Sequence, residues 1–247
     1  IEPKEVILAP TYERVVPLTH YCWLTSNTYV DKKARRTDIE PLIQKTCNKP
    51  VIIKKANGEF VSDTARDIGK IKSWMWDNRC YVKRPHVINN IAKYLKQNNM
   101  LPAINFIFSR RHVELAAAEI QHSLHGDDET CASTVGKACR KILAEKLSNY
   151  HEYLELPEYK QLVSLLEKGI AFHHGGMMQV LKEMVELLFD QGYIKMLFAT
   201  ETFAVGINMP TKTVIFHTLE KWDGHSKRQL APHEYTQMAG RAGRRGL

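Results

Sequence analysis

The hydrophobic residues of this chain change their spacing near residue 85. Beyond it, short apolar runs alternate with longer segments in which apolar residues recur three or four positions apart, as in an amphipathic helix. The short runs predict buried strands at residues 103–108, 169–172, 195–199 and 213–217. The longer segments predict helices at residues 87–95, 112–123, 135–147, 159–166 and 180–190, and a further helix opened by Pro232.

Short strands that alternate with helices are typical of crossover units that join parallel strands. We therefore predict an α/β fold in which helices cover both faces of a parallel sheet. We place a boundary at residue 85, with residues 1–85 as an entry segment and residues 86–247 as the α/β domain.

The entry segment has an irregular pattern that predicts some β structure. Val15–Leu24 and Val51–Ile53 are apolar runs, and the second precedes Asn57-Gly58, a strong hairpin signal. Asp31–Arg36 is strongly charged and predicts a solvated loop. No segment in this third has the residue spacing of an active site.

Charge is distributed unevenly along the chain. Its 35 Lys and Arg against 27 Asp and Glu give a formal net charge of +8, and the first hundred residues alone carry an excess of eight basic side chains. Such an excess fits nucleic-acid binding or simply a solvated surface. Trp74 and Trp76 stand among basic residues there, either as a nucleic-acid surface or, as we favour, as a packed interdomain or hairpin element.

Several protein classes are excluded by simple features of the sequence. Five scattered cysteines without a Cys-x-x-Cys pair argue against a disulfide framework or a structural zinc site, and favour a reducing compartment. The apolar runs are too short to span a bilayer, and residues 1–10 lack a signal-peptide pattern. We expect an intracellular protein, nuclear or cytoplasmic, with no membrane association and no oligomer.

Polar, small or basic residues follow each predicted strand. They are Ser109 to Arg111, His173 to Gly176, Thr200 to Thr202, and His217 with Thr218. Because ligands of parallel α/β sheets bind at the carboxyl ends of the strands, we expect function to reside in these segments. Near the end of the chain, Arg241 and Arg244 each follow a glycine, and two such guanidiniums suit a polyphosphate, although a basic tail would look the same.

Four strings resemble, in chain order, motifs IV, IVa, V and VI of superfamily 2 helicases. They are FIFSRR (106–111), IAFHHGGM (170–177), ATETFAVGINMP (199–210) and QMAGRAGRRG (237–246). ETFAVGINMP, the KWDG at 221–224 and the paired arginines of GRAGRRG are similar, more narrowly, to the superkiller family of RNA helicases that feed the RNA exosome. RVVPLTHY (14–21) resembles the segment by which that family's chain enters its second RecA-like domain.

The resemblance implies a RecA-like fold and the second motor domain of an ATP-dependent RNA helicase that moves 3′ to 5′ on single-stranded RNA. An RNA exosome or another RNA-decay complex is the implied partner. Arg241 and Arg244 would act as arginine fingers, Gln237 would sense the γ-phosphate, and Gly206 and Asn208 would face the nucleotide. The residues implied to hold the RNA backbone are Ser109, Arg110, His174, Gly175, Thr200 and Thr202.

The sequence has no G-x-x-x-x-G-K-[ST] phosphate loop, since neither Gly69-Lys70 nor Gly136-Lys137 is followed by Ser or Thr. The acidic string at 127–130 lies in a polar stretch and not after a buried strand. In the family, ATP and Mg²⁺ are held by the first RecA-like domain, so we expect this chain to supply half of an active site and no ATPase activity alone. We expect no metal site, because neighbouring strand residues such as His173 and His174 point to opposite faces.

Two other functions remain open from the sequence. One is a DNA-repair helicase of the same superfamily, although such relatives commonly carry proline at the position of Arg245. The other is a nucleic-acid-binding scaffold without motor activity. The presence of Gln237, Arg241 and Arg244 argues against the scaffold.

Overall fold

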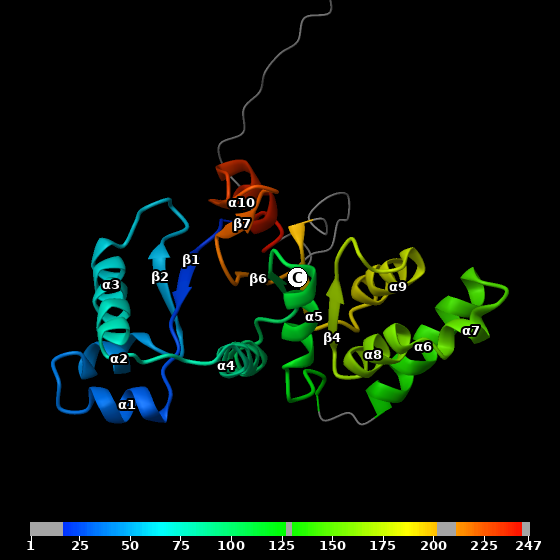
Figure 1. Cartoon of the computed structure of the whole chain (residues 1–247), viewed down its shortest axis with the longest axis horizontal. Coiled ribbons are helices and arrows are strands. Elements are labelled where there is room, and N and C mark those ends of the chain that lie inside the picture. The colour runs from blue at the N-terminus through cyan, green and yellow to red at the C-terminus, as the bar shows by residue number, and fades with distance from the viewer. Residues whose placement is uncertain (1–16, 127–129, 202–210, 244–247) are drawn as a thin grey trace, which may run out of the picture.

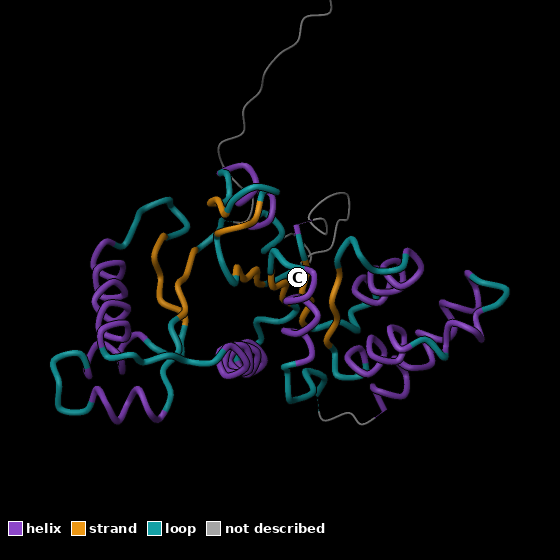
Figure 2. Tube along the Cα trace, in the orientation of Figure 1, coloured by secondary structure: helices purple, strands orange, loops and turns teal. Residues whose placement is uncertain are grey.

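The computed structural model describes residues 17–126, 130–201 and 211–243. Within them the chain forms two neighbouring parts (Figure 1). Residues 17–83, here called the N-terminal unit, combine helices with a small sheet. Residues 84–243, here called the sheet unit, contain a central parallel sheet with helices around it (Figure 2).

In the N-terminal unit, three helices accompany a two-stranded antiparallel sheet. The strands are β1 (His20–Trp23) and β2 (Pro50–Lys54), in which Tyr21 lies opposite Ile52. The helices are α1 (Thr28–Ala34), α2 (Glu40–Thr46) and α3 (Ser62–Asp77). The unit has a hydrophobic cluster of its own, which contains Val30, Ala34, Ile39, Ile43, Cys47, Ile71 and Cys80. The predicted β character is confirmed, whereas the sequence did not predict the three helices.

The prediction of a solvated loop at Asp31–Arg36 is wrong for most of this segment. Residues 31–34 belong to α1, which begins after Asn27, whose side chain accepts a hydrogen bond from the Val30 N–H. Val30 and Ala34 lie one helical turn apart and are both buried in the cluster, so packing stabilises a helix that the charges concealed. At the predicted hairpin, Gly58 stands in a tight reversal, but the chain then enters α3 instead of a full second strand.

The central sheet has four parallel strands in the order β4-β5-β3-β6. They are β3 (Ala103–Phe106), β4 (Ile170–His173), β5 (Met196–Ala199) and β6 (Thr213–Phe216). Every residue of β3, β4 and β5 is buried, so both faces of the sheet are covered, as the apolar runs predicted. The strands are in register, and their last residues, Phe106, His173, Ala199 and Phe216, form one row at the carboxyl edge.

Helices flank this sheet. They are α4 (Arg84–Gln97), α5 (Arg110–Ala118), α6 (Thr130–Lys146), α7 (Tyr150–Leu154), α8 (Pro157–Leu166) and α9 (Gln179–Asp190). In α9, Leu181, Met184, Val185 and Leu188 are buried, as its apolar face predicted, while Leu187 is exposed. The predicted helix at 112–123 begins earlier and ends at Ala118.

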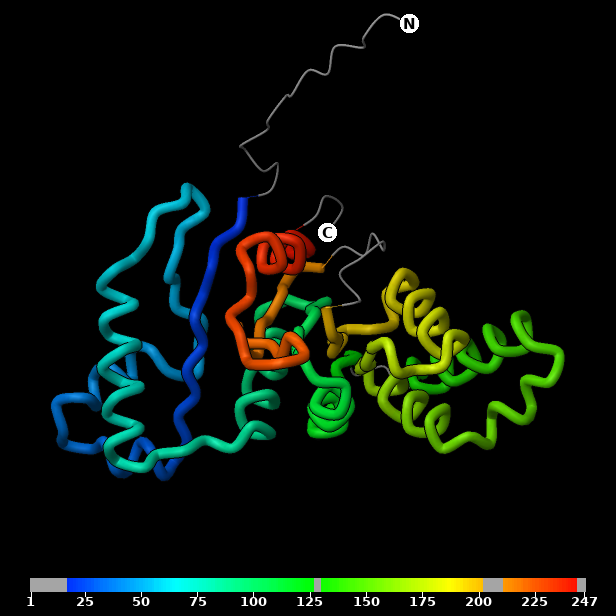
Figure 3. Tube along the Cα trace, turned by 45° about the horizontal axis from the view of Figure 1, so that its top comes forward, coloured from blue at the N-terminus to red at the C-terminus, as the bar shows by residue number. Residues whose placement is uncertain are grey.

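A hairpin and a short helix complete the sheet unit. The strands β7 (Glu220–Trp222) and β8 (Lys227–Gln229) pair in antiparallel fashion, and α10 (Pro232–Ala239) follows. β1 of the N-terminal unit lies beside this region in both Figure 1 and Figure 3. There, His20 Nδ1 and the Tyr235 hydroxyl share a hydrogen bond of 2.6 Å. Over the residues described, no helix is both long enough and apolar enough to cross a membrane.

Candidate nucleic-acid and nucleotide site

The carboxyl edge of the sheet collects most of the residues predicted to hold RNA. The strand register places the segments after β3, β4 and β5 side by side. These segments contain Ser109 and Arg110, His174 and Gly175, and Thr200. Thr202 belongs to the same predicted set but lies outside the described residues.

Arg110 lies against the loop that follows β4. A Cβ built on Gly176 would stand 3.3 Å from Arg110 Cδ, and one built on Gly175 would stand 3.8 Å from Arg110 Nη2. Arg110 and both glycines are exposed, so the guanidinium and the backbone of this loop face solvent together. A positive charge beside exposed backbone at a sheet edge is suited to bind a phosphate.

His174 has a different environment from the one that RNA contact requires. Its ring is 4% exposed, Nε2 lies 2.8 Å from Glu114 Oε1, and Nδ1 accepts a hydrogen bond from the Gly176 N–H. Both ring nitrogens are therefore engaged inside the protein. The geometry supports a role for His174 in shaping the Gly175–Gly176 loop, and direct RNA contact by this ring stays a prediction.

The neighbouring histidine faces a separate partner. His173 Nε2 lies 2.9 Å from Glu186 Oε1 on α9. Burial lowers the pKa of His173, although Glu186 acts in the opposite direction. The two histidines thus have different carboxylate partners, and the described residues contain no group of three or more side chains arranged to hold a metal ion.

Ser109 and Thr200 hold the edge in shape through local hydrogen bonds. Ser109 caps α5, where its Oγ accepts a hydrogen bond from the His112 N–H at 3.4 Å. This cap places Arg110 in the first helical turn. The Thr200 N–H donates to the His173 carbonyl oxygen at 3.2 Å, so the segment after β5 is tied to the end of β4.

Two of the residues predicted to face the nucleotide, Gln237 and Arg241, belong to α10 and the turn after it. Gln237 is exposed, whereas Arg241 is 3% exposed. The turn is anchored by Thr211, whose Oγ1 donates to the Arg241 carbonyl oxygen at 3.1 Å and whose own carbonyl accepts from the Gly243 N–H at 2.8 Å. Three further predicted residues, Gly206, Asn208 and Arg244, lie outside the described part of the chain.

Two glycines are required in this turn for different reasons. A Cβ on Gly240 would lie 2.8 Å from the Thr236 carbonyl oxygen, closer than real Cβ contacts come. Gly243 has φ of +62°, a conformation that other residues adopt at a cost. Gly240 therefore allows the tight end of α10 against Thr236, and Gly243 allows the turn whose N–H reaches the Thr211 carbonyl oxygen.

A chain of charges joins the two groups of predicted residues. Lys221 Nζ on β7 lies 3.6 Å from Glu201, which follows Thr200, and 2.7 Å from Glu234 in the first turn of α10. Glu234 also accepts two hydrogen bonds from Arg228 and one from the Ala231 N–H. Arg228 first, and then Lys221, hold the pKa of Glu234 well below its usual range. Glu234 precedes Gln237 by three residues, so both lie on one side of α10.

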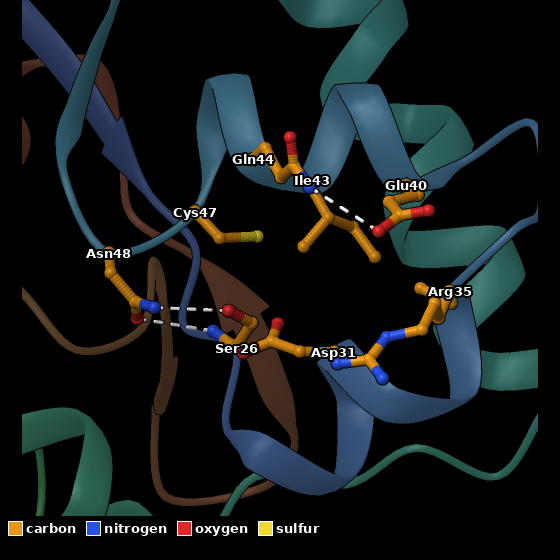
Figure 4. A pocket seen from close by; sticks show the side chains of 9 residues that line it. Ser26, Asp31, Arg35, Glu40, Ile43, Gln44, Cys47 and Asn48 are labelled. Carbon is orange, nitrogen blue, oxygen red and sulfur yellow. Dashed lines mark hydrogen bonds between the residues drawn. The ribbon is translucent and has the colours of Figure 1, made fainter.

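A surface cavity of about 330 Å³ lies elsewhere, in the N-terminal unit. Figure 4 shows its mixed lining of Asp31, Glu40 and Arg35, with Cys47 among the lining residues. Burial raises the pKa of Cys47 to about 11, so this thiol is protonated at neutral pH and is a poor nucleophile. The chemistry of the cavity therefore gives no reason to place an active site there.

Sequence reasoning missed the carboxylates and the lysine that support this site. Glu114 and Glu186 are ordinary helix residues by pattern, and nothing local reveals that each meets a histidine after or within β4. Glu234 did have a local signal, because it stands two residues after Pro232 at a helix start, where a glutamate often reaches back to the preceding backbone. Lys221 was part of the KWDG string that supported the family resemblance, but the sequence assigned no role to its side chain.

Comparison with known proteins identifies the family of this chain. Residues 139–246 match the family described as the helicase conserved C-terminal domain. The chain is 44% identical over 158 residues to the antiviral helicase SKI2 of Saccharomyces cerevisiae, an overlap of 64% of this chain and 12% of that protein. It is 37% identical over 209 residues to the human exosome RNA helicase MTR4, covering 79% of this chain and 19% of that protein.

A third relative aligns with almost the whole chain. The DExH-box ATP-dependent RNA helicase DExH9 of Arabidopsis thaliana is 35% identical over 240 residues, which cover 95% of this chain and 23% of that protein. The chain therefore spans between 12% and 23% of the length of these three relatives. The fold, the strand-end edge and the family match define the sheet unit as a RecA-like C-terminal domain of a superfamily 2 helicase. More narrowly, the chain belongs to the superkiller and exosome-cofactor type.

Proposed function

We propose that this chain works as the second motor domain of an ATP-dependent helicase that moves 3′ to 5′ on single-stranded RNA. The observation that carries the proposal is the Arg110 guanidinium against the exposed Gly175–Gly176 loop, at the carboxyl edge of a parallel sheet. Two of the relatives named above, MTR4 and DExH9, are RNA helicases by name, which favours this function over DNA repair or a passive scaffold.

RNA would be held at this edge by its phosphates. Arg110 supplies the charge, and the exposed backbone at Gly175 allows a strand to approach closely. Thr200 and Thr202 would add hydrogen bonds from the next segment, and Ser109 and His174 would keep the edge in shape. Contacts to phosphate carry no sequence information, so binding is expected to tolerate any sequence and to weaken with salt.

The α10 region would face ATP, whose phosphoryl transfer to water powers the motor. Gln237 is exposed on α10, and its amide together with the guanidiniums of Arg241 and Arg244 would form a donor set that suits a triphosphate. Arg241 and Arg244 would stabilise the charge on the transferring phosphoryl group, and Arg241, which is 3% exposed, would have to turn outward to do so. Gly206 and Asn208 would lie near the nucleotide. Mg²⁺ and the phosphate loop would belong to a partner RecA-like domain, because the sequence printed here has no such loop.

The proposed layout keeps a boundary at residue 85. It is supported by the two hydrophobic clusters, since one ends at Cys80 and the other begins at Ile88. We propose an RNA exosome or a related RNA-decay complex as the partner of the whole protein, on the strength of its likeness to the exosome RNA helicase MTR4.

The binding of the 247-residue chain to RNA tests this proposal. Fluorescence anisotropy with a labelled single-stranded RNA of about 20 nucleotides would measure affinity across a range of salt concentrations. Arg110→Ala is expected to weaken binding roughly 3-fold to 10-fold and to lower the salt slope by about one, because one phosphate contact is lost.

Arg111→Ala is the matched control, since Arg111 is also exposed in the first turn of α5. It should have a smaller effect than Arg110→Ala. Equal losses from the two substitutions, or an affinity that does not change with salt, would contradict the proposed RNA contact at the strand ends.

A further inference from the structure

An exposed group of aromatic and basic side chains lies where α1 meets the end of α3. We call it the α1–α3 corner and define it by Tyr29, Lys33, Trp76, Arg79 and Tyr81. Lys33 Nζ donates to the Asn78 carbonyl oxygen at 2.5 Å and lies 5.8 Å from the Tyr29 ring centroid. Trp76 and Tyr81 contact each other edge to face, with centroids 6.5 Å apart. Residues 45 positions apart in sequence are thus joined on one surface.

The three rings of the corner are unusually exposed. Trp76 is 72% exposed, Tyr81 65% and Tyr29 57%. Trp74, by contrast, packs against the hydrophobic cluster of the N-terminal unit. The prediction that both tryptophans are packed against the rest of the protein is therefore confirmed for Trp74 and wrong for Trp76. Large exposed aromatic side chains in one place are typical of a binding surface.

The charges around these rings are almost all positive. Residues 28–36 and 70–83 together contain eight basic side chains against two acidic ones, Asp31 and Asp77. Within the described residues, none of the eight lies within 4.0 Å of a carboxylate, although Lys45, Lys55 and Arg66 of the same unit all form ion pairs. Among the described residues, no direct ion pair therefore neutralises the positive charge of the corner. Lys72 stands one helical turn before Trp76, on the same face of α3.

We propose that the α1–α3 corner is a second binding site for single-stranded RNA. Bases would stack on Trp76 and Tyr81, and Lys33, Lys72 and Arg79 would contact the adjacent phosphates. Exposed rings among cations that lack carboxylate partners are the combination that single-stranded nucleic acid needs, because stacking and charge neutralisation then act on neighbouring atoms. The inference rests on the proposed function only for the choice of RNA as the strand.

The corner is a separate place on the molecule. In Figure 1, α1 and the adjoining end of α3 lie at the left, in the N-terminal unit, away from the sheet unit that carries α5 and β4. A strand held there would be gripped independently of the strand-end edge. The excess of basic residues in the first hundred positions, which the motifs leave unexplained, then has a role.

The experiment compares two exposed aromatic substitutions in the 247-residue chain, using anisotropy of a labelled oligouridine of about 20 nucleotides. Trp76→Ala is expected to weaken binding roughly 5-fold to 100-fold, since stacking of one base is lost, and Trp76→Phe is expected to retain most of the affinity. Phe60→Ala is the matched control, because Phe60 is 70% exposed at the other end of α3 and should leave binding unchanged. Both side chains, Trp76 and Phe60, lie on the surface, so circular dichroism of all three variants should show the native fold.

Unchanged affinity in Trp76→Ala and in Tyr81→Ala would overturn the second site. If those variants instead lose binding to polyglutamate and keep binding to RNA, the corner is a docking surface for an acidic protein and the proposal is wrong. A loss with Trp76→Ala but none with Arg110→Ala would support the corner while contradicting the strand-end contact. The reverse result would leave the proposed function intact and reject the corner.

Discussion

Lys221 is the residue on which the connection between the two halves of the site depends. It is largely buried between Glu201, beside the proposed RNA edge, and Glu234, one turn before Gln237. Two carboxylates meet there, and Glu234 keeps Arg228 as a second partner. Loss of Lys221 would leave Glu201, the residue after Thr200, without its ion pair to the hairpin.

Lys221→Met is therefore expected to lower the free energy of unfolding by about 1–2 kcal/mol and to weaken RNA binding several-fold. Lys221→Arg, which preserves the charge, should restore most of the RNA affinity. Urea denaturation and anisotropy measure the two effects. Lys227→Met removes an exposed lysine from the same hairpin and serves as the control. RNA affinity that is identical in Lys221→Met and wild type would show that the charge chain does not influence the RNA edge.

For single residues, the sequence predicted which side chains lie at the sheet edge better than it predicted whether they are buried or exposed there. Arg110 and Gly175 were predicted from their places after two strands, and the structure brings them together. His174 was predicted from the same rule, yet it is buried against Glu114. The place of a residue after a strand predicts that it lies at the edge of the sheet. Whether it is buried there depends on the helix that packs over it, and for His174 that helix carries Glu114, 60 residues earlier in the chain.

At the scale of elements, a column of four rings connects the two units. Phe106 of β3 stacks on Phe216 of β6 with centroids 5.7 Å apart, and Phe216 stacks on Tyr235 of α10 at 4.9 Å. Tyr235 in turn stacks on His20 of β1 at 5.8 Å and shares a hydrogen bond with it. α10, which carries Gln237, is thus held between the central sheet and the N-terminal unit.

Tyr235→Phe should reduce the free energy of unfolding by about 0.5–1.5 kcal/mol, because only the hydrogen bond to His20 is lost. Tyr235→Ala should cost more, since two ring contacts disappear as well. Urea denaturation measures both. A double-mutant cycle with His20→Ala isolates the pair, and strictly additive effects would mean that the two rings do not stabilise each other.

The four strands of the central sheet and most of its helices were predictable to within a few residues because each satisfies a local rule, whereas β7, β8 and α7 were not predicted. β3, β4 and β5 are apolar throughout since they are buried on both faces, and α9 repeats its apolar residues at helical spacing. α1 also has an apolar face, but only Val30 and Ala34 are buried and charged residues surround them. Two apolar residues are too few to recognise a helical pattern. Short elements that depend on neighbours for burial escape prediction from sequence.

For the molecule as a whole, stability should fall as the solution is acidified. Burial lowers the pKa of His125 and of His173 in the folded protein below the ordinary value of 6.5. The unfolded chain therefore binds protons more readily, and the stabilisation present above about pH 6.5 is lost as pH falls through that value towards the lower folded pKa.

Urea denaturation at pH 7.5 and at pH 5.5 measures this dependence. His125→Gln should flatten it, because burial first, and then the charges of Lys195 and Lys96, disfavour a positive charge on His125. His122→Gln is the control, since His122 is exposed, and should retain the wild-type dependence. A free energy of unfolding that is higher at pH 5.5 than at pH 7.5 would contradict the predicted direction of the effect.

The sequence by itself determined the α/β class, the four strands of the central sheet and the residues that follow them, together with the family to which the motifs point. These properties are local. Burial on one face or both sets the spacing of apolar residues along a helix or strand, and the polar residues after a strand can be identified directly in the sequence. Only the tertiary structure decided the strand order, the burial of His174, the outward position of Trp76 and the bridge through Lys221. Those depend on contacts between residues far apart in the chain, and such contacts follow from how the elements pack together and not from any local pattern.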